Sequence, residues 1–148
     1  MKHGKDFASF VMKEKMKSTK SIKHHWIGLK PNPKKYFGFV YLITNLVNGK
    51  MYIGKKQYHV YKKRKIARQS DWHYYESSSK YVKEDIKTYG KESFEFRILK
   101  HYKTRGGLVY GEANIQHKRD VLVKRIDEDN RLYYNAQIAG IKFIPKEY

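Results

Sequence analysis

The sequence contains no cysteine, only three prolines, and few acidic residues, with 14 Asp and Glu against 33 Lys and Arg in 148 residues. The absence of cysteine excludes a disulfide-stabilised scaffold, a thiol nucleophile and cysteine-ligated zinc. No apolar run approaches the roughly 18 residues that span a bilayer, so we expect no membrane partner. The first ten residues lack an apolar stretch with a cleavage site, which predicts a cytoplasmic protein without a signal peptide.

The excess of basic residues gives a formal net charge of +19. A field of this size costs stability through self-repulsion and attracts polyanions, so it indicates contact with nucleic acid. Hydrophobic residues make up 40% of the chain and aromatic residues 16%. This composition supplies one hydrophobic core and excludes full disorder, and the length allows one domain with an extension.

Residues 1–36 are more basic than the rest of the chain. They contain ten lysines against two acidic residues, which gives this segment a net charge of +8. Helical spacing of apolar residues between positions 7 and 14 predicts a short amphipathic helix, and the Pro-Asn-Pro sequence at 31–33 predicts an extended linker. We expect residues 1–36 to be a basic extension, either a disordered tail or an arm on nucleic acid, and residues 37–148 to be the domain.

Two apolar runs near the start of the domain predict a β-hairpin. Residues 37–43 are apolar, β-branched and aromatic, which is typical of a strand buried on both faces. Asn48-Gly49 precedes a second run over 50–54, and Asn-Gly between two such runs is the strongest short hairpin signal, because both residues tolerate positive φ.

The turn also predicts the register of this hairpin. If Val47 pairs with Lys50, Asn45 lies opposite Tyr52. Because side chains alternate between the faces of a strand, Tyr41 has the same facing as Asn45. The sequence therefore predicts that Tyr41 and Tyr52 lie on one face.

The rest of the chain predicts two helices and a third strand. A serine cap, an apolar face and a final glycine indicate a helix over 77–89, and alternation indicates a strand over 94–99. A second helix is expected from 108 to about 124, residues 55–72 are expected to be a loop with a short helix, and the tail from 132 is expected to be irregular with at most one strand. This order favours an α+β fold with a small mixed antiparallel sheet flanked by helices.

These residues resemble the GIY-YIG nucleases over roughly residues 37–138. The resemblance implies a three-stranded antiparallel sheet flanked by helices, and a phage or homing-type endonuclease that cuts DNA with a divalent metal. Its signature is Val40-Tyr41, then ten residues, then Tyr52-Ile53-Gly54. Further similarity to phage homing-type members lies in Ser77-Ser78-Ser79-Lys80, Tyr89-Gly90, residues 94–99, Glu112 and Asn135.

The resemblance places four residues at catalytic positions and implies a role for three of them. Tyr41 would be the base that activates water, and Tyr52 would bind or orient the scissile phosphate. A tyrosine is a poor base at its usual pKa of about 10, but a metal-bound water and nearby cations make its phenolate accessible. Glu112 would bind Mg²⁺, which Mn²⁺ could replace, because a hard carboxylate suits an ion that keeps most of its waters. Asn135 matches the late asparagine of the family.

The basic residues after Tyr52 are expected to act on phosphate. Lys55 would lower the pKa of Tyr41 or contact phosphate, and Lys56 is an equal candidate because the register puts it opposite Tyr41. Counting from either side gives Lys62 or Arg64 as the arginine that stabilises the transition state. We choose Arg64, because its fork holds two phosphate oxygens. The residues expected to contact nucleic acid are Gly54, Lys56, Lys62, Lys63, Arg68 and His73.

The chain departs from the family pattern at three points. Phe39 stands where many members have glycine, histidines that relatives carry near Arg68 and Ser77 are missing here, and 23 residues separate Glu112 from the late asparagine. Residues 127–130 are acidic, and we expect them to form a solvated turn.

Two functional interpretations account for the charge of the chain, whereas a third, a structural interaction domain, explains the fold but not the net charge of +19. The first is a Mg²⁺-dependent endonuclease acting on DNA, expected to be double-stranded, with any oligomer forming only on DNA. The alternative is a non-catalytic basic DNA- or RNA-binding protein. Charge and aromatic content serve both, whereas the combination of Tyr41, Tyr52 and Glu112 favours the enzyme, because pure phosphate binding needs no carboxylate.

Overall fold

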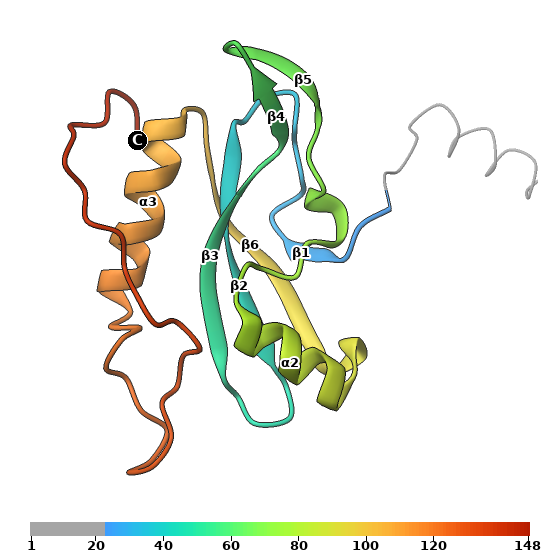
Figure 1. Ribbon diagram of the computed structural model, residues 1–148, viewed down its shortest axis with the longest axis vertical. Coiled ribbons are helices and arrows are strands. Elements are labelled where there is room, and N and C mark those ends of the chain that lie inside the picture. Colours follow the sequence, from blue (N-terminus) through green and yellow to red (C-terminus); the bar gives the residue numbers. More distant parts are fainter. Residues whose placement is uncertain (1–22) are drawn as a thin grey trace, which may run out of the picture.

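The computed structural model describes residues 23–148, and the helix predicted between positions 7 and 14 lies outside this range. Four strands form the main sheet in the order β1-β6-β2-β3, and β4 and β5 form a separate hairpin. Two helices and two short 3₁₀ turns complete the fold (Figure 1). The elements are β1 (Trp26–Gly28), β2 (Gly38–Asn45), β3 (Met51–Gln57), β4 (His59–Lys62), β5 (Lys65–Gln69), η1 (Trp72–Tyr74), α2 (Lys80–Tyr89), η2 (Lys91–Ser93), β6 (Phe94–Tyr102) and α3 (Arg105–Lys118).

The main sheet lies between two apolar layers, because alternate residues of β2 enter different cores. One core contains Tyr41 and Ile43 and is closed by Val82 of α2 and by Trp72. The other contains Val40, Leu42 and Ile53 and is closed by Leu108 of α3. The strand over 37–43 was predicted to be buried on both faces, and this is confirmed. Figure 1 shows α2 and α3 on opposite sides of the sheet.

The predicted hairpin between β2 and β3 is present, with a register two residues away from the expected one. Tyr52 pairs with Ile43 and not with Asn45. The connecting loop is longer than a two-residue turn, since the Asn45 N–H donates to the Lys50 carbonyl at 2.8 Å. Because the shift is an even number of residues, Tyr41 and Tyr52 still share a face, as predicted.

Residues 55–72 were predicted to be a loop with a short helix, and this is wrong. β3 continues to Gln57, and β4 and β5 then form an antiparallel hairpin before η1. Its turn is Lys63-Arg64, with φ of 51° and 67°. The Asn and Gly residues that signal such a turn are absent, which is why the pattern did not reveal it.

The sheet has four strands where three were expected. β2, β3 and β6 form the antiparallel part, and β1 adds a parallel strand to β6, with Trp26 opposite Phe96. Trp26 is only 4% exposed and its indole N–H donates to the Trp72 carbonyl at 2.7 Å. The predicted basic extension over 1–36 therefore includes a strand of the sheet.

Both helices begin and end at identifiable caps. α2 starts three residues later than expected, because the Ser79 hydroxyl accepts from Val82 N at 3.3 Å, and it ends at Gly90 as predicted, with φ of 89°. α3 starts earlier than expected, at the Thr104 cap, and ends at Lys118 and not near 124. Neither helix in residues 23–148 has the length and apolar character that a membrane crossing requires.

The tail from residue 132 is irregular, as predicted, and its first residues extend the outer edge of β3. Leu132 O accepts from Met51 N at 2.9 Å, and Tyr134 N donates to Met51 O at 2.7 Å. The acidic turn at 127–130 is exposed, which agrees with the predicted solvated turn.

Candidate active site

The two signature tyrosines lie on one face of the β2–β3 hairpin. Tyr41 pairs with Gly54 across the hairpin, and Tyr52 pairs with Ile43. Their ring centroids are 6.2 Å apart. Tyr41 is 1% exposed, whereas Tyr52 is partly exposed, so Tyr52 is the phenol that faces outward.

Gly54 leaves the space that the Tyr41 phenol occupies. A Cβ built on Gly54 would overlap the hydroxyl and Cζ of Tyr41 and would lie 2.8 Å from the Tyr52 ring. Because β3 is the edge strand, the phenol of Tyr41 reaches over it from the neighbouring strand toward the outer edge of the sheet. The sequence interpretation gave this glycine a phosphate contact, and the structure adds this packing reason.

Glu112 approaches the same edge from α3. Its carboxylate is 3.4 Å from the Nζ of Lys55, and its side chain is 12% exposed, against 39% for Lys55. Negative charge on Glu112 acts on the phenols of both Tyr41 and Tyr52. The structure thus brings together five predicted site residues from two strands and one helix, namely Tyr41, Tyr52, Gly54, Lys55 and Glu112.

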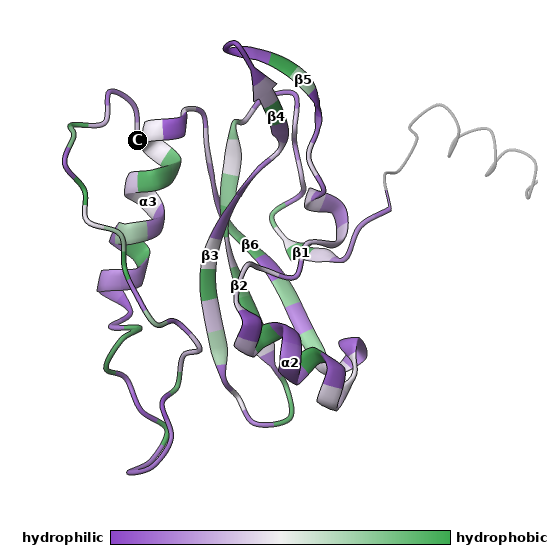
Figure 2. Ribbon diagram, viewed as in Figure 1, coloured by the Kyte–Doolittle hydropathy of each residue, from purple (hydrophilic) through white to green (hydrophobic). Residues whose placement is uncertain are grey.

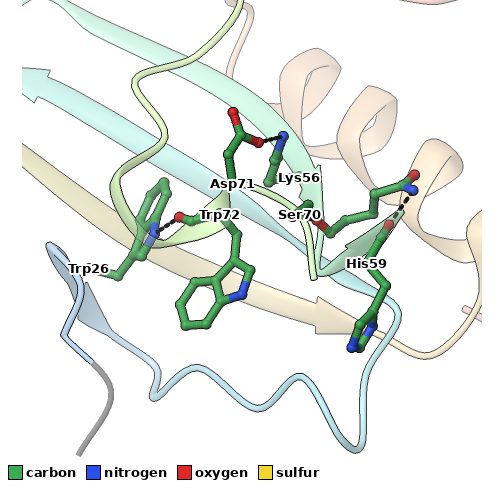
Figure 3. A network of polar contacts seen from close by, with 7 residues as sticks. Trp26, Lys56, His59, Ser70, Asp71 and Trp72 are labelled. Carbon is green, nitrogen blue, oxygen red and sulfur yellow. Dashed lines mark hydrogen bonds and ion pairs between the residues drawn. The ribbon is translucent and has the colours of Figure 1, made fainter. Parts of the chain in front are cut away.

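A third phenol, Tyr75, joins this cluster, and sequence reasoning missed it. Its ring is 6.2 Å from that of Tyr41 in an edge-on arrangement, and Lys56 Nζ lies 3.9 Å from its centroid. Lys56 also forms an ion pair of 2.5 Å with Asp71, which Figure 3 shows. Lys56 was expected opposite Tyr41, but it pairs with Phe39, so it reaches the cluster through Tyr75.

Burial raises the pKa of every acidic group in the cluster. It raises the pKa of Tyr41 well above its usual 10.0, with further contributions from Tyr52, Tyr75 and Glu112. Burial also raises the pKa of Tyr52, and a hydrogen bond with Ser78 lowers it again in part. The pKa of Glu112 is raised by burial and partly lowered again by Lys55. The cluster therefore disfavours negative charge as it stands.

This electrostatic arrangement fits a divalent cation held by one carboxylate. Among the described residues, no three metal-ligating side chains gather closely enough to hold an ion by themselves. Mg²⁺ needs only one or two protein carboxylates and keeps several waters. Glu112 offers a partly exposed carboxylate beside two phenols whose ionisation a positive charge would favour.

Asn135 lies beside the cluster and forms two hydrogen bonds with the backbone of Ile53, between Tyr52 and Gly54. Its Oδ1 accepts from Ile53 N at 3.0 Å and its Nδ2 donates to Ile53 O at 2.8 Å. Gln116, four residues after Glu112 on α3, donates to the same carbonyl at 3.0 Å. Both side chains are buried, so Gln116 fixes β3 against α3 and Asn135 fixes β3 against the chain that follows α3. Gln116 carries no motif that could have revealed this role.

The remaining predicted site residues lie elsewhere. The structure records no contact of Arg64 with the phenols or with Glu112, since Arg64 forms the turn between β4 and β5. His73 stacks on Trp72 with centroids 3.9 Å apart and lines a cavity of about 450 Å³ with Asp71 and Tyr75. Three further residues that were predicted to contact nucleic acid lie in the same β4–β5 hairpin, namely Lys62, Lys63 and Arg68.

Comparisons with known proteins identify the family of the chain. The family model described as "Putative endonuclease segE, GIY-YIG domain" matches residues 21–138. The chain is 31% identical over 105 residues to a protein of Enterobacteria phage T4 named "Putative endonuclease segE". That match covers 71% of this chain and 43% of the relative, so the chain spans less than half of the relative's length. No solved structure matches the chain. The chain belongs to the segE-type GIY-YIG nuclease family.

Proposed function

We propose that the chain is a divalent-metal-dependent endonuclease that hydrolyses phosphodiester bonds in double-stranded DNA. The observation that carries this proposal is the convergence of Tyr41, Tyr52 and Glu112 around Gly54 at the edge of β3. A surface that only bound phosphate would gain nothing from a carboxylate among its contacts. The matching GIY-YIG family model and the phage relative are both described as endonucleases, which supports the same reaction class.

Proton transfer from water is assigned to the phenolate oxygen of Tyr41, which forms when the phenol loses its proton to solvent. Burial keeps this phenol protonated at neutral pH, so it can act as a base only when positive charge is brought close to it. Glu112 would hold that charge as Mg²⁺, with Mn²⁺ as a substitute. When bound, the ion lowers the pKa of coordinated water and neutralises charge on the phosphate.

The other groups bind the phosphate and balance its charge. The partly exposed hydroxyl of Tyr52 donates a hydrogen bond to a non-bridging oxygen, and the ammonium of Lys55 opposes the charge that develops as water attacks phosphorus. The P–O bond then breaks and the leaving oxygen takes up a proton from solvent water. Lys55 and Lys56 supply the cationic groups near the cluster, the role expected of Arg64.

A plasmid-nicking assay with the purified chain tests the proposal. Supercoiled DNA is incubated with Mg²⁺, with Mn²⁺ or with chelator, using wild type, Tyr41→Phe and Glu112→Gln. Exposed residues of α2 provide matched controls, namely Tyr81→Phe and Glu84→Gln. We expect metal-dependent nicking that falls at least about 100-fold in the two site variants and is unchanged in the controls, since positioned proton transfer contributes roughly that factor or more.

Two outcomes would contradict the proposal. Wild-type rates in Tyr41→Phe or Glu112→Gln would remove the assigned role. Tight DNA binding without cleavage under either metal would instead support the alternative, a non-catalytic DNA- or RNA-binding protein. Circular dichroism spectra of all five proteins would establish that the variants remain folded.

A further inference from the structure

The β4–β5 hairpin concentrates positive charge that the domain does not use internally. Residues 59–69 contain five Lys and Arg residues and no acidic residue. All five are exposed, and none forms an ion pair with a carboxylate within residues 23–148. Figure 2 shows the hairpin as largely hydrophilic, apart from a short stretch of β5. The five cations are Lys62, Lys63, Arg64, Lys65 and Arg68.

The turn of the hairpin consists of two cationic residues at positions whose backbone conformation favours Asn or Gly. Lys63 and Arg64 have φ of 51° and 67°, the left-handed region in which a Cβ is crowded. Asn and Gly tolerate this region and are typical of two-residue turns. A pair of long cations held there indicates a surface selected for contact with an anion.

The base of the hairpin is fixed to the domain. The Ser70 hydroxyl donates to Gln57 O at 2.7 Å, and the Gln57 side chain donates to His59 O at 2.6 Å. Tyr61 of β4 stacks on Phe37 with centroids 5.5 Å apart. Because these contacts order the base, the hairpin is held in place before it meets a partner, and Figure 1 shows it projecting past the main sheet.

The dimensions of the hairpin match the major groove of B-DNA. A five-residue strand extends about 16 Å, which exceeds the groove depth of about 8.5 Å, and a groove about 12 Å wide admits a two-stranded ribbon. β4 follows β3 after one residue, so Gly54 and Lys62 are eight residues apart and at most about 26 Å from each other. That length corresponds to about 8 base pairs at 3.4 Å each.

We propose that the β4–β5 hairpin enters the major groove of duplex DNA, where its cations contact phosphates on both sides of the groove. The groove contact lies up to about 8 base pairs from the bond that is cut. Only this distance to the cut bond rests on the proposed function; the groove contact itself does not. Duplex DNA fits and duplex RNA does not, because the major groove of A-form RNA is too narrow for side chains to read.

Binding without cleavage tests the proposal. Fluorescence anisotropy with a 30-base-pair DNA duplex in chelator gives the dependence of affinity on salt for wild type and for a variant that combines Lys62→Gln, Lys63→Gln, Lys65→Gln and Arg68→Gln. A control removes the same charge from exposed sites elsewhere, with Lys87→Gln, Lys118→Gln, Lys124→Gln and Lys142→Gln. We expect the slope of log affinity against log salt to decrease by about 3 to 4 in the hairpin variant, at about 0.9 per phosphate contact, and by less than about one in the control.

Dimethyl sulfate protection tests the groove, because it reports guanine N7 in the major groove. We expect protected guanines that lose their protection in the hairpin variant only. Equal slopes in the two variants, no protection at N7, or equal competition by duplex RNA would each overturn the proposal. A slope change in the hairpin variant together with a wild type that never cuts DNA would refute the proposed function and leave the hairpin contact intact. A wild type that cuts DNA together with an unchanged slope in the hairpin variant would do the reverse.

Discussion

The phenol of Tyr41 lies across the backbone of Gly54 on the neighbouring strand. The two residues pair in the antiparallel ladder, and a Cβ on Gly54 would overlap the phenol hydroxyl. Glycine is therefore needed for Tyr41 to reach the sheet edge that Glu112 approaches from the opposite layer. The glycine in the second part of the family signature is therefore required sterically by the tyrosine in the first part.

Gly54→Ala should nearly abolish nicking while the fold persists. The added methyl group displaces the Tyr41 hydroxyl, and a displacement of about 1 Å at a reacting group costs roughly 100-fold in rate. Gly140→Ala is the matched control, because nothing lies within 4 Å of its Cβ position. Nicking rates and thermal melts of both variants check this, and a wild-type rate in Gly54→Ala would contradict the steric role.

Asn135 should prove to be a positioning residue with a large effect on stability. Asn135→Ala removes two buried hydrogen bonds to Ile53 and leaves its N–H unpaired, while Gln116 still donates to the carbonyl. We expect the free energy of unfolding to fall by about 2 kcal/mol, measured by urea denaturation. Gln116→Ala should cost less, because Asn135 still donates to Ile53 O. Lost nicking with unchanged stability would instead indicate a direct part in the chemistry for Asn135.

The shared face of the two signature tyrosines could be predicted from the sequence, although the register could not. Asn48-Gly49 located the hairpin, and the loop proved longer than two residues because Asn45 closes it with Lys50. An error of two residues preserves the face of each side chain but changes its partner. That is why Tyr41 was assigned the correct face and Lys56 the wrong neighbour.

Features held by distant contacts could not be predicted. The hydrogen bonds between Asn135 and Ile53 join residues 82 positions apart in the sequence. Tyr75 reaches the cluster from a segment whose apolar residues show no periodic spacing. Strand β1 has only three residues inside a basic stretch, so neither alternation nor length signalled it. The β4–β5 hairpin was missed because cations occupy its turn.

Trp26→Ala should be among the most destabilising substitutions in the chain. The indole is buried against Phe39 and Tyr41, with centroids 5.0 and 5.3 Å away, and its N–H pairs with Trp72 O. Truncating a buried aromatic side chain to Ala costs about 3 to 5 kcal/mol, which urea denaturation measures. Ile27→Ala on the same strand serves as control, since Ile27 is 43% exposed. Equal stability of the two variants would show that β1 is dispensable to the core.

Stability should decline as the pH falls below 6.5, because partial burial keeps two histidines in the neutral form. Burial lowers the pKa of His25 to about 3, with a contribution from Lys91, and burial lowers that of His101 to about 4. His101 Nε2 also lies 2.7 Å from the Tyr58 hydroxyl, whose pKa burial raises to about 12.

The unfolded chain takes up these two protons near pH 6.5, well before the folded protein does. The stability that the neutral rings provide is therefore complete above pH 6.5 and is lost progressively toward pH 4. Both rings are partly exposed, so solvent screening limits the loss to about 1 kcal/mol per pH unit. Urea midpoints between pH 7.0 and 5.5 measure this slope above the range in which most carboxylates titrate. A variant with His25→Phe and His101→Gln should flatten it, and His117→Gln, at an exposed site, should not. An equal slope in all three proteins would mean that neither buried ring governs the acid sensitivity.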